Sequence, residues 1–196
     1  MKILNASLLA LALTLPLAAC GEKPAANAPA TDTTIGAKVR EATDKARKEM
    51  AEGNISIGSD GAKVEVTPTG DLLINSTSIP LNDSQRAITL RYRTQVIGIA
   101  EAGIDIGVQG ANLGAQAAGE AIKGIFSGNS EQIEARINAE ADKIKASAAK
   151  ICDQLPALMA TQQQLAAAVP EFKPYAKMDQ SDIDDCRNGN GNVQIP

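Results

Sequence analysis

The stretch that decides the fold is residues 96–128, which read VIGIAEAGIDIGVQGANLGAQAAGEAIKGIFSG. Glycine and alanine recur there at alternating steps of four and three, which places them along one face of a helix. This small-residue seam consists of Gly103, Gly107, Gly110, Gly114, Ala117, Ala121, Gly124 and Gly128. Polar residues such as Glu101 and Gln109 fall on the opposite face, and large aliphatic residues flank the seam. The stretch therefore predicts an amphipathic helix whose buried centre is backbone rather than side chain.

The seam needs a physical reason, because each glycine inside a helix costs about 1 kcal/mol relative to alanine. A groove of glycines allows another helix to approach closely and to gain dispersion contacts along its length. We therefore expect the isoleucines of the next helix in this chain to fill the groove. A partner chain or a membrane is the alternative, although Glu101 and Asp105 interrupt the apolar run of a simple membrane span.

Working outward, the sequence predicts an α+β fold, with a small antiparallel β-meander followed by a long antiparallel helical hairpin. Residues 54–81 alternate apolar and polar side chains between turn signals such as Asp60-Gly61 and Ser76-Thr77. This alternation indicates three or four short strands with one apolar face. A sheet of this size needs a helix to cover it.

Two long helices follow the meander. Asn82 and Gln85 have the spacing of a capping box, which predicts that a glycine-rich helix spans residues 82–127. A tight glycine turn leads into a second long helix over residues 129–169, so the two helices should form an antiparallel hairpin. Pro156 lacks a backbone donor and should kink the second helix near Cys152.

The other segments complete the predicted organisation of the chain. We expect a signal peptide, a flexible tether, one α+β domain and a disordered tail. Their predicted bounds are 1–19, 20–34, 35–187 and 188–196. Within the domain, residues 35–53 should form a modest amphipathic helix and residues 170–187 a C-terminal return.

The N-terminus has the features of a bacterial lipoprotein leader. Lys2 is followed by the apolar run Ile3–Leu15, which is too short for a membrane span and typical of an export signal. Leu17-Ala18-Ala19 then precedes Cys20, which resembles the lipoprotein box and implies lipidation of Cys20. Gly21 stands where an inner-membrane retention signal would show aspartate. These features favour an anchor in the outer membrane, facing the periplasm.

Cys152 and Cys186 remain once Cys20 is assigned to the lipid. Two cysteines in an oxidising compartment are more often paired than free, so we expect a disulfide between them. The bond would pin the C-terminal return against the second long helix. A redox-active or metal-binding pair is the alternative, but the cysteines are not closely spaced and the chain has no histidine.

No complete catalytic or metal-binding motif is present in the sequence. Ser147 and Lys150 match the Ser-x-x-Lys pattern of serine acyl enzymes, but the accompanying Ser-Asp-Asn and Lys-Thr-Gly motifs are missing. A cluster of aspartates lacks the loop spacing of an EF-hand, and helix capping explains it better. The cluster comprises Asp179, Asp182, Asp184 and Asp185. The net charge of −4 and the 2% aromatic content argue against nucleic-acid binding. We expect neither a cofactor nor enzymatic activity.

One internal stretch resembles a known family. Residues 64–93 are similar to the corresponding stretch of the YggN-like bacterial envelope proteins, in which a Gly-Asp-hydrophobic strand and a short turn precede a Leu-x-x-x-Gln helix start. The residues that carry this resemblance are Gly70, Asp71, Leu81, Gln85 and Tyr92. The family is itself of unknown function, so the resemblance implies no activity, cofactor or catalytic residue.

Together these features predict a non-enzymatic, lipid-anchored module that binds or scaffolds another envelope component or self-associates. The alternative is binding of a lipid or apolar ligand, or contact with the membrane, through the glycine-faced helix.

Overall fold

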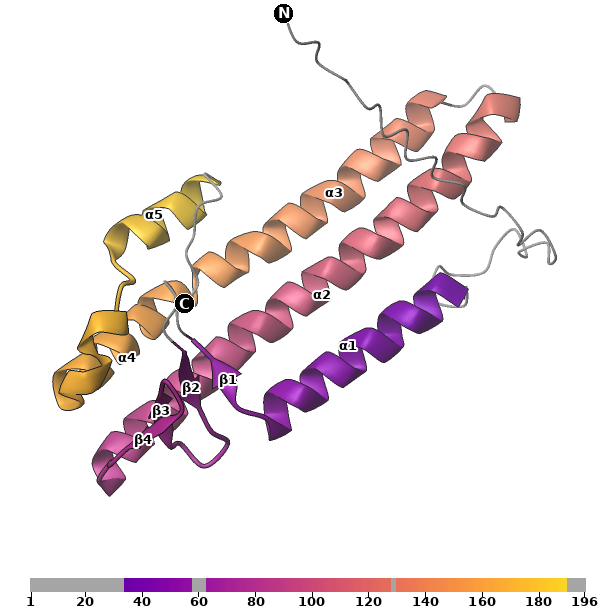
Figure 1. The fold of residues 1–196 in the computed structure, drawn as a ribbon. Coiled ribbons are helices and arrows are strands. Elements are labelled where there is room, and N and C mark those ends of the chain that lie inside the picture. Colours follow the sequence, from indigo (N-terminus) through magenta and orange to yellow (C-terminus); the bar gives the residue numbers. More distant parts are fainter. Residues whose placement is uncertain (1–33, 58–62, 128–129, 190–196) are drawn as a thin grey trace, which may run out of the picture.

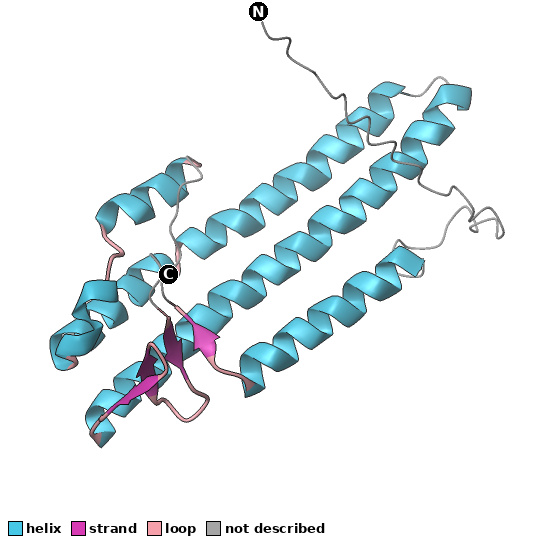
Figure 2. Cartoon of the chain, in the orientation of Figure 1, coloured by secondary structure: helices cyan, strands magenta, loops and turns pink. Residues whose placement is uncertain are grey.

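A computed structural model describes residues 34–57, 63–127 and 130–189 of the chain. It confirms the predicted α+β fold, in which a small antiparallel sheet precedes long helices (Figures 1 and 2). Several predicted features lie outside the described residues. These are the signal peptide, the tether up to residue 33, the Asp60-Gly61 turn, the helix start at Asn129 and the tail from residue 190.

The sheet is an antiparallel meander with its strands in sequence order. The strands are β1 (Ile55–Ser56), β2 (Val64–Val66), β3 (Leu72–Ile74) and β4 (Thr77–Ile79). Ile74 pairs with Thr77, so Asn75 and Ser76 form a two-residue hairpin turn. Both have positive φ, 49° and 65°, as a type I′ turn requires. The turn therefore lies one residue earlier than the predicted Ser76-Thr77.

Three long helices lie side by side, with α2 in the middle (Figure 1). They are α1 (Thr34–Glu52), α2 (Asp83–Ser127) and α3 (Ser130–Cys152). Both flanking helices run antiparallel to α2, so the predicted helical hairpin is present (Figure 1). We call this arrangement the three-helix layer, and the end near Ser127 its hairpin end.

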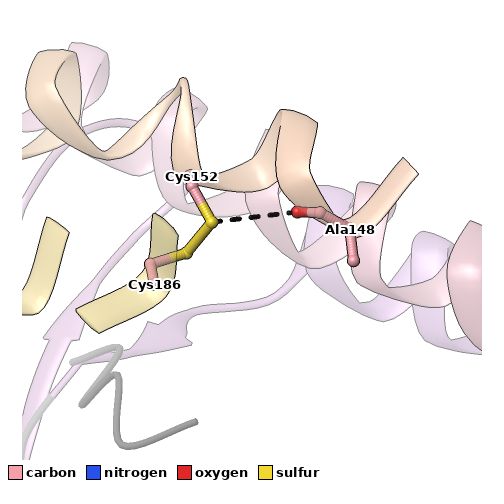
Figure 3. Close-up of a disulfide and its surroundings, with 3 residues drawn as sticks. All are labelled: Ala148, Cys152 and Cys186. Carbon is pink, nitrogen blue, oxygen red and sulfur yellow. Dashed lines mark hydrogen bonds between the residues drawn. A yellow bond between two sulfur atoms is a disulfide. The ribbon is translucent and has the colours of Figure 1, made fainter. Parts of the chain in front are cut away.

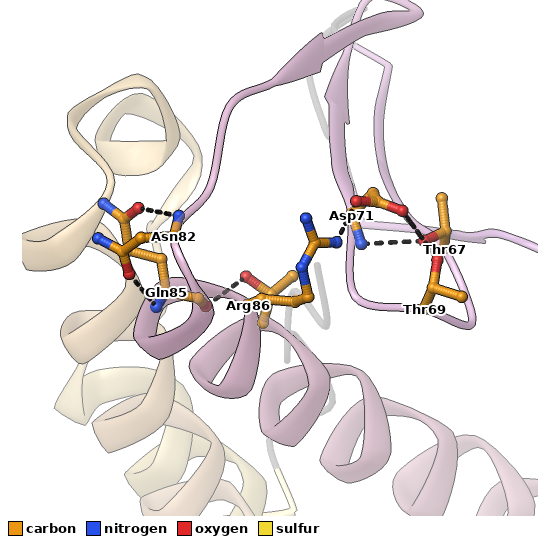
Figure 4. A network of polar contacts seen from close by, with 7 residues as sticks. Thr67, Thr69, Asp71, Asn82, Gln85 and Arg86 are labelled. Carbon is orange, nitrogen blue, oxygen red and sulfur yellow. Dashed lines mark hydrogen bonds and ion pairs between the residues drawn. The ribbon is translucent and has the colours of Figure 1, made fainter.

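The capping box predicted at the start of α2 is present. The backbone N–H of Gln85 donates to Asn82 Oδ1 at 2.9 Å, and that of Asn82 donates to Gln85 Oε1 at 2.9 Å (Figure 4). Gln85 Nε2 also donates to the carbonyl of Ala168, at 2.6 Å. The side chain that caps α2 therefore also ties it to a segment 83 residues later in the chain.

The prediction of one continuous helix over residues 129–169 is wrong. The structure divides it into α3, which ends at Cys152, and α4 (Leu155–Ala168). Pro156 occupies the first turn of α4, where its missing N–H costs no hydrogen bond, so it starts a new helix. The C-terminal return consists of a 3₁₀ helix, η2 (Pro170–Tyr175), and of α5 (Gln180–Asn188).

The sheet, the first turns of α2, and α4, η2 and α5 enclose one core at the end of the three-helix layer that is opposite its hairpin end. We call this part the head. Its largest fully buried side chains include Tyr92, Phe172, Leu72, Leu158 and Leu165.

Candidate functional site

The seam glycines continue a stripe of α2 that begins inside the head. Thr89, Tyr92 and Ile99 lie on this stripe and are buried against the head. Further steps of four and three along the same face lead from Ile99 to four glycines. These are Gly103, Gly107, Gly110 and Gly114, which we call the glycine face. Large side chains thus give way to glycine where the stripe leaves the head.

The predicted packing of α3 into the glycine face is wrong. All four glycines are exposed, and a Cβ built on any of them would meet no neighbouring atom within 4 Å. Ala117, further along the seam, is half-buried. Ala121 and Gly124 belong to the part of the seam for which no side-chain surroundings are described. Within residues 34–57, 63–127 and 130–189, no contact therefore offsets the cost of these glycines.

The reason is that α3 packs on another face of α2. Leu113 and Gln116 of α2 line a groove of about 240 Å³ together with Ile144 of α3, and Glu120 pairs with Arg136 at 2.8 Å. In a helix of 3.6 residues per turn, these α2 positions lie about a third of a turn away from the glycine face. Ile144 of α3 therefore lies beside leucine and amide side chains of α2 rather than beside glycine.

The glycine face has a distinct chemical character. A step of about 100° per residue places every charged and amide side chain between Ile99 and Ala118 on the other half of α2. The half with the glycines carries only Gly, Ala, Ile and Leu over a length of about 28 Å. It is a smooth apolar strip that allows a very close backbone approach.

The predicted disulfide between Cys152 and Cys186 is present and joins the end of α3 to α5 (Figure 3). Ile183 of α5 is 1% exposed and belongs to the core of the head. Covalent and apolar contacts thus both hold α5 in the head.

All five residues that carry the YggN-like resemblance have structural contacts, and Leu81 packs as a partly buried side chain against the core of the head. Gly70 has a φ of 82°, and a Cβ there would lie 2.6 Å from Leu90 Cγ. Asp71 accepts hydrogen bonds from Arg86, Thr69 and Thr67 (Figure 4). The bond from Arg86 is the main cause of the lowered pKa of Asp71. With the cap at Gln85 and the buried ring of Tyr92, these residues hold the sheet onto α2.

A buried polar network in the head could not be predicted in detail. Gln162 is fully buried, donates from Nε2 to Tyr92 Oη at 3.1 Å and accepts from the backbone N–H of Met178 at 3.0 Å. The ring of Tyr92 meets that of Phe172 edge to face, with centroids 5.8 Å apart. The one available signal is a glutamine on the apolar stripe of its helix. The network is structural, because both side chains are satisfied within the core.

Because Tyr92 is buried, we predict that the folded protein loses stability at alkaline pH. Burial raises its pKa to about 12 in the folded chain, against about 10 for an exposed tyrosine. Its contribution is fully present below pH 10 and falls as pH rises toward 12, by up to about 2–3 kcal/mol. Urea titrations from pH 8 to 11.5 should show this fall in the wild type and a shallower one in Tyr92→Phe. Parallel curves would contradict the assignment.

The remaining candidate residues come together into no further site. Ser147 is half-buried and Lys150 exposed on α3. Asp179 and Asp182 form the capping box of α5, as the capping interpretation predicts. No group of three or more metal-ligating side chains occurs among residues with a described position. Over that same part of the chain, no helix combines the length and apolar character needed to cross a membrane.

Comparison with known proteins yields one partial similarity. Residues 126–177 match a family described as "Protein of unknown function (DUF2884)". The matched segment contains α3, α4 and η2 and lies outside the stretch that resembles the YggN-like proteins. No curated protein and no solved structure matches the chain. The comparison therefore supports similarity to an uncharacterised family and no more specific name.

Proposed function

We propose that the protein is a lipid-anchored module on the periplasmic face of the outer membrane, which binds another envelope protein and catalyses no reaction. The observation that carries the proposal is the exposed glycine face. Its four glycines cost roughly 4 kcal/mol relative to alanine, a large share of the stability of a small domain. Glycines that weaken a helix without a compensating contact in the described part of the chain are typical of a functional surface. The lipoprotein box that ends at Cys20 supports the anchor.

The chemistry of the glycine face favours a helix as the partner. A strip of glycine and alanine gains contact area only when a solid ridge of side chains lies close against the backbone. The same stripe of α2 already receives such a helix inside the head, where α4 packs with Leu155, Leu158 and Leu165 buried. A partner helix with aliphatic residues at steps of three and four would continue this interface along α2.

A lipid surface fits the glycine face less well. Helices that bind membrane interfaces insert large apolar side chains and carry Lys and Arg on the polar face. The strip offers mainly glycine and alanine, and no arginine or lysine occurs on α2 between Gly98 and Glu120. The groove between α2 and α3 is also a poor lipid site, because Gln109, Glu140 and Lys143 contribute to its lining.

Crosslinked capture from intact envelopes tests the proposal with two leucine variants. Gly110→Leu fills the glycine face, whereas Gly119→Leu is a matched control on the far side of the same helix. Gly119 is exposed, and a Cβ there also meets nothing within 4 Å. We expect a protein that is recovered with the wild type and with Gly119→Leu to be lost with Gly110→Leu.

Three outcomes would count against the proposal. Equal recovery with both leucine variants would show that the glycine face binds no protein. Lipid that co-purifies with the wild type and is lost with Gly110→Leu would favour the lipid-binding alternative. Mass spectrometry that finds an unmodified Cys20 in the membrane-extracted chain would contradict the anchor.

A further inference from the structure

The polarity of α1 relative to the head is fixed by two sets of contacts. Arg93 of α2 donates to the carbonyls of Met50 at 2.8 Å and Gly53 at 2.6 Å, which holds the last turn of α1 against the head. Burial lowers the pKa of Arg93, and these carbonyls compensate by accepting from its charged side chain. One helical turn earlier, Arg47 pairs with Asp105. The N-terminal end of α1 therefore lies toward the hairpin end of the three-helix layer, and its C-terminal end lies at the head (Figure 1).

The same two contacts also set the level of Thr34 along α2. Because α1 and α2 are antiparallel, Thr34 lies level with residues 109–118 of α2. The lower bound is counted from the Arg93–Met50 contact and the upper bound from the Arg47–Asp105 contact. At 1.5 Å per residue, Gly110 is at most about 12 Å from that level along the axis of α2. Tyr92, in the head, is about 26–39 Å from it. The chain thus enters the fold much closer to the glycine face than to the head.

The segment between the lipid site and the fold is short. Thirteen residues, 21–33, lie between Cys20 and Thr34, and they are rich in Ala, Pro and Thr. A flexible chain of that length has a root-mean-square span of about 20 Å, and even full extension gives only about 50 Å. The average span is shorter than the distance from Thr34 to the head.

From these lengths we infer that the lipid on Cys20 holds the hairpin end of the three-helix layer nearest the bilayer and the head farthest from it. The glycine face then meets its partner within a few tens of ångströms of the membrane surface, which points to a helix close to the membrane. This inference rests on the lipid anchor of the proposed function.

Energy transfer to the membrane surface tests the inference. The lipidated chain is placed on phosphatidylcholine vesicles that carry an acceptor dye on the headgroup. A donor dye is attached in turn to Lys38→Cys, Glu49→Cys and Lys173→Cys. All three positions are exposed, the first two near opposite ends of α1 and the third in η2 of the head. We expect transfer efficiency to fall in the order Lys38, Glu49, Lys173.

The outcomes separate the inference from the anchor. Vesicle-bound protein with equal or reversed efficiencies would overturn the orientation and leave the anchor intact. Protein that stays in the supernatant would contradict the anchor and, with it, the orientation. Lys38→Cys combined with Cys20→Ala is the control, and it should show no transfer because it lacks the lipid site.

Discussion

Replacing Phe172 by alanine should lower the free energy of unfolding by about 3–5 kcal/mol, the usual cost of deleting a buried aromatic ring. Phe172 is 1% exposed and packs edge to face on Tyr92, so its removal leaves a cavity where η2 meets α2. Urea unfolding of the mature chain carrying Cys20→Ala, which removes the lipid, measures the change. Glu171→Ala is the matched control, because Glu171 is the exposed neighbour in η2.

The control should change the free energy of unfolding by no more than about 0.5 kcal/mol. A similar, small loss in both variants would mean that η2 is not part of the cooperative core. The head would then not unfold as one packed unit.

Removing the disulfide should have an effect of similar size. The bond between Cys152 and Cys186 closes a loop with a sequence separation of 34, and the chain-entropy model assigns such a loop roughly 3–4 kcal/mol. The double variant Cys152→Ala/Cys186→Ala should lose that stability in the same urea experiment. Hydrogen exchange should show the largest loss of protection in α5, because Ile183 is the one buried side chain of this helix.

Reduction of the wild type by dithiothreitol provides an independent check. It should lower stability to about the level of the double variant. A change below about 1 kcal/mol in both experiments would show that the apolar contacts of α5 hold the return without the bond.

Features set by short-range interactions could be predicted from the sequence. The capping box at Asn82 and Gln85 needs residues only three positions apart, and the structure has it. The disulfide has a sequence separation of 34, but it could be predicted because only two cysteines remained to pair once Cys20 was assigned to the lipid. The turn at Asn75-Ser76 was predicted one residue too late, because the sequence alone allows Asn75 to be either the last residue of a strand or the first residue of the turn.

Features set by contacts distant in the sequence could not be predicted. Helical periodicity identified the seam correctly as one face of α2, but it cannot say which neighbour covers that face. Which neighbour covers the face depends on the direction in which α3 packs along α2. It also depends on the break between α3 and α4, where Pro156 lies in the first turn of α4. The pairing of Gln162 with Tyr92 spans 70 residues and depends on the same break.

The most direct test of the central claim is the thermal unfolding midpoint of the triple variant Gly107→Ala/Gly110→Ala/Gly114→Ala. It is measured in the Cys20→Ala background at a protein concentration low enough to keep the chain monomeric. If the glycine face is free in the folded chain, each alanine adds about 1 kcal/mol, and the midpoint rises by roughly 6–12 °C. Gly119→Ala, the matched single variant, should rise by about a third as much. A lowered midpoint in the triple variant would show that the glycine face is already packed within the chain, and would contradict the account.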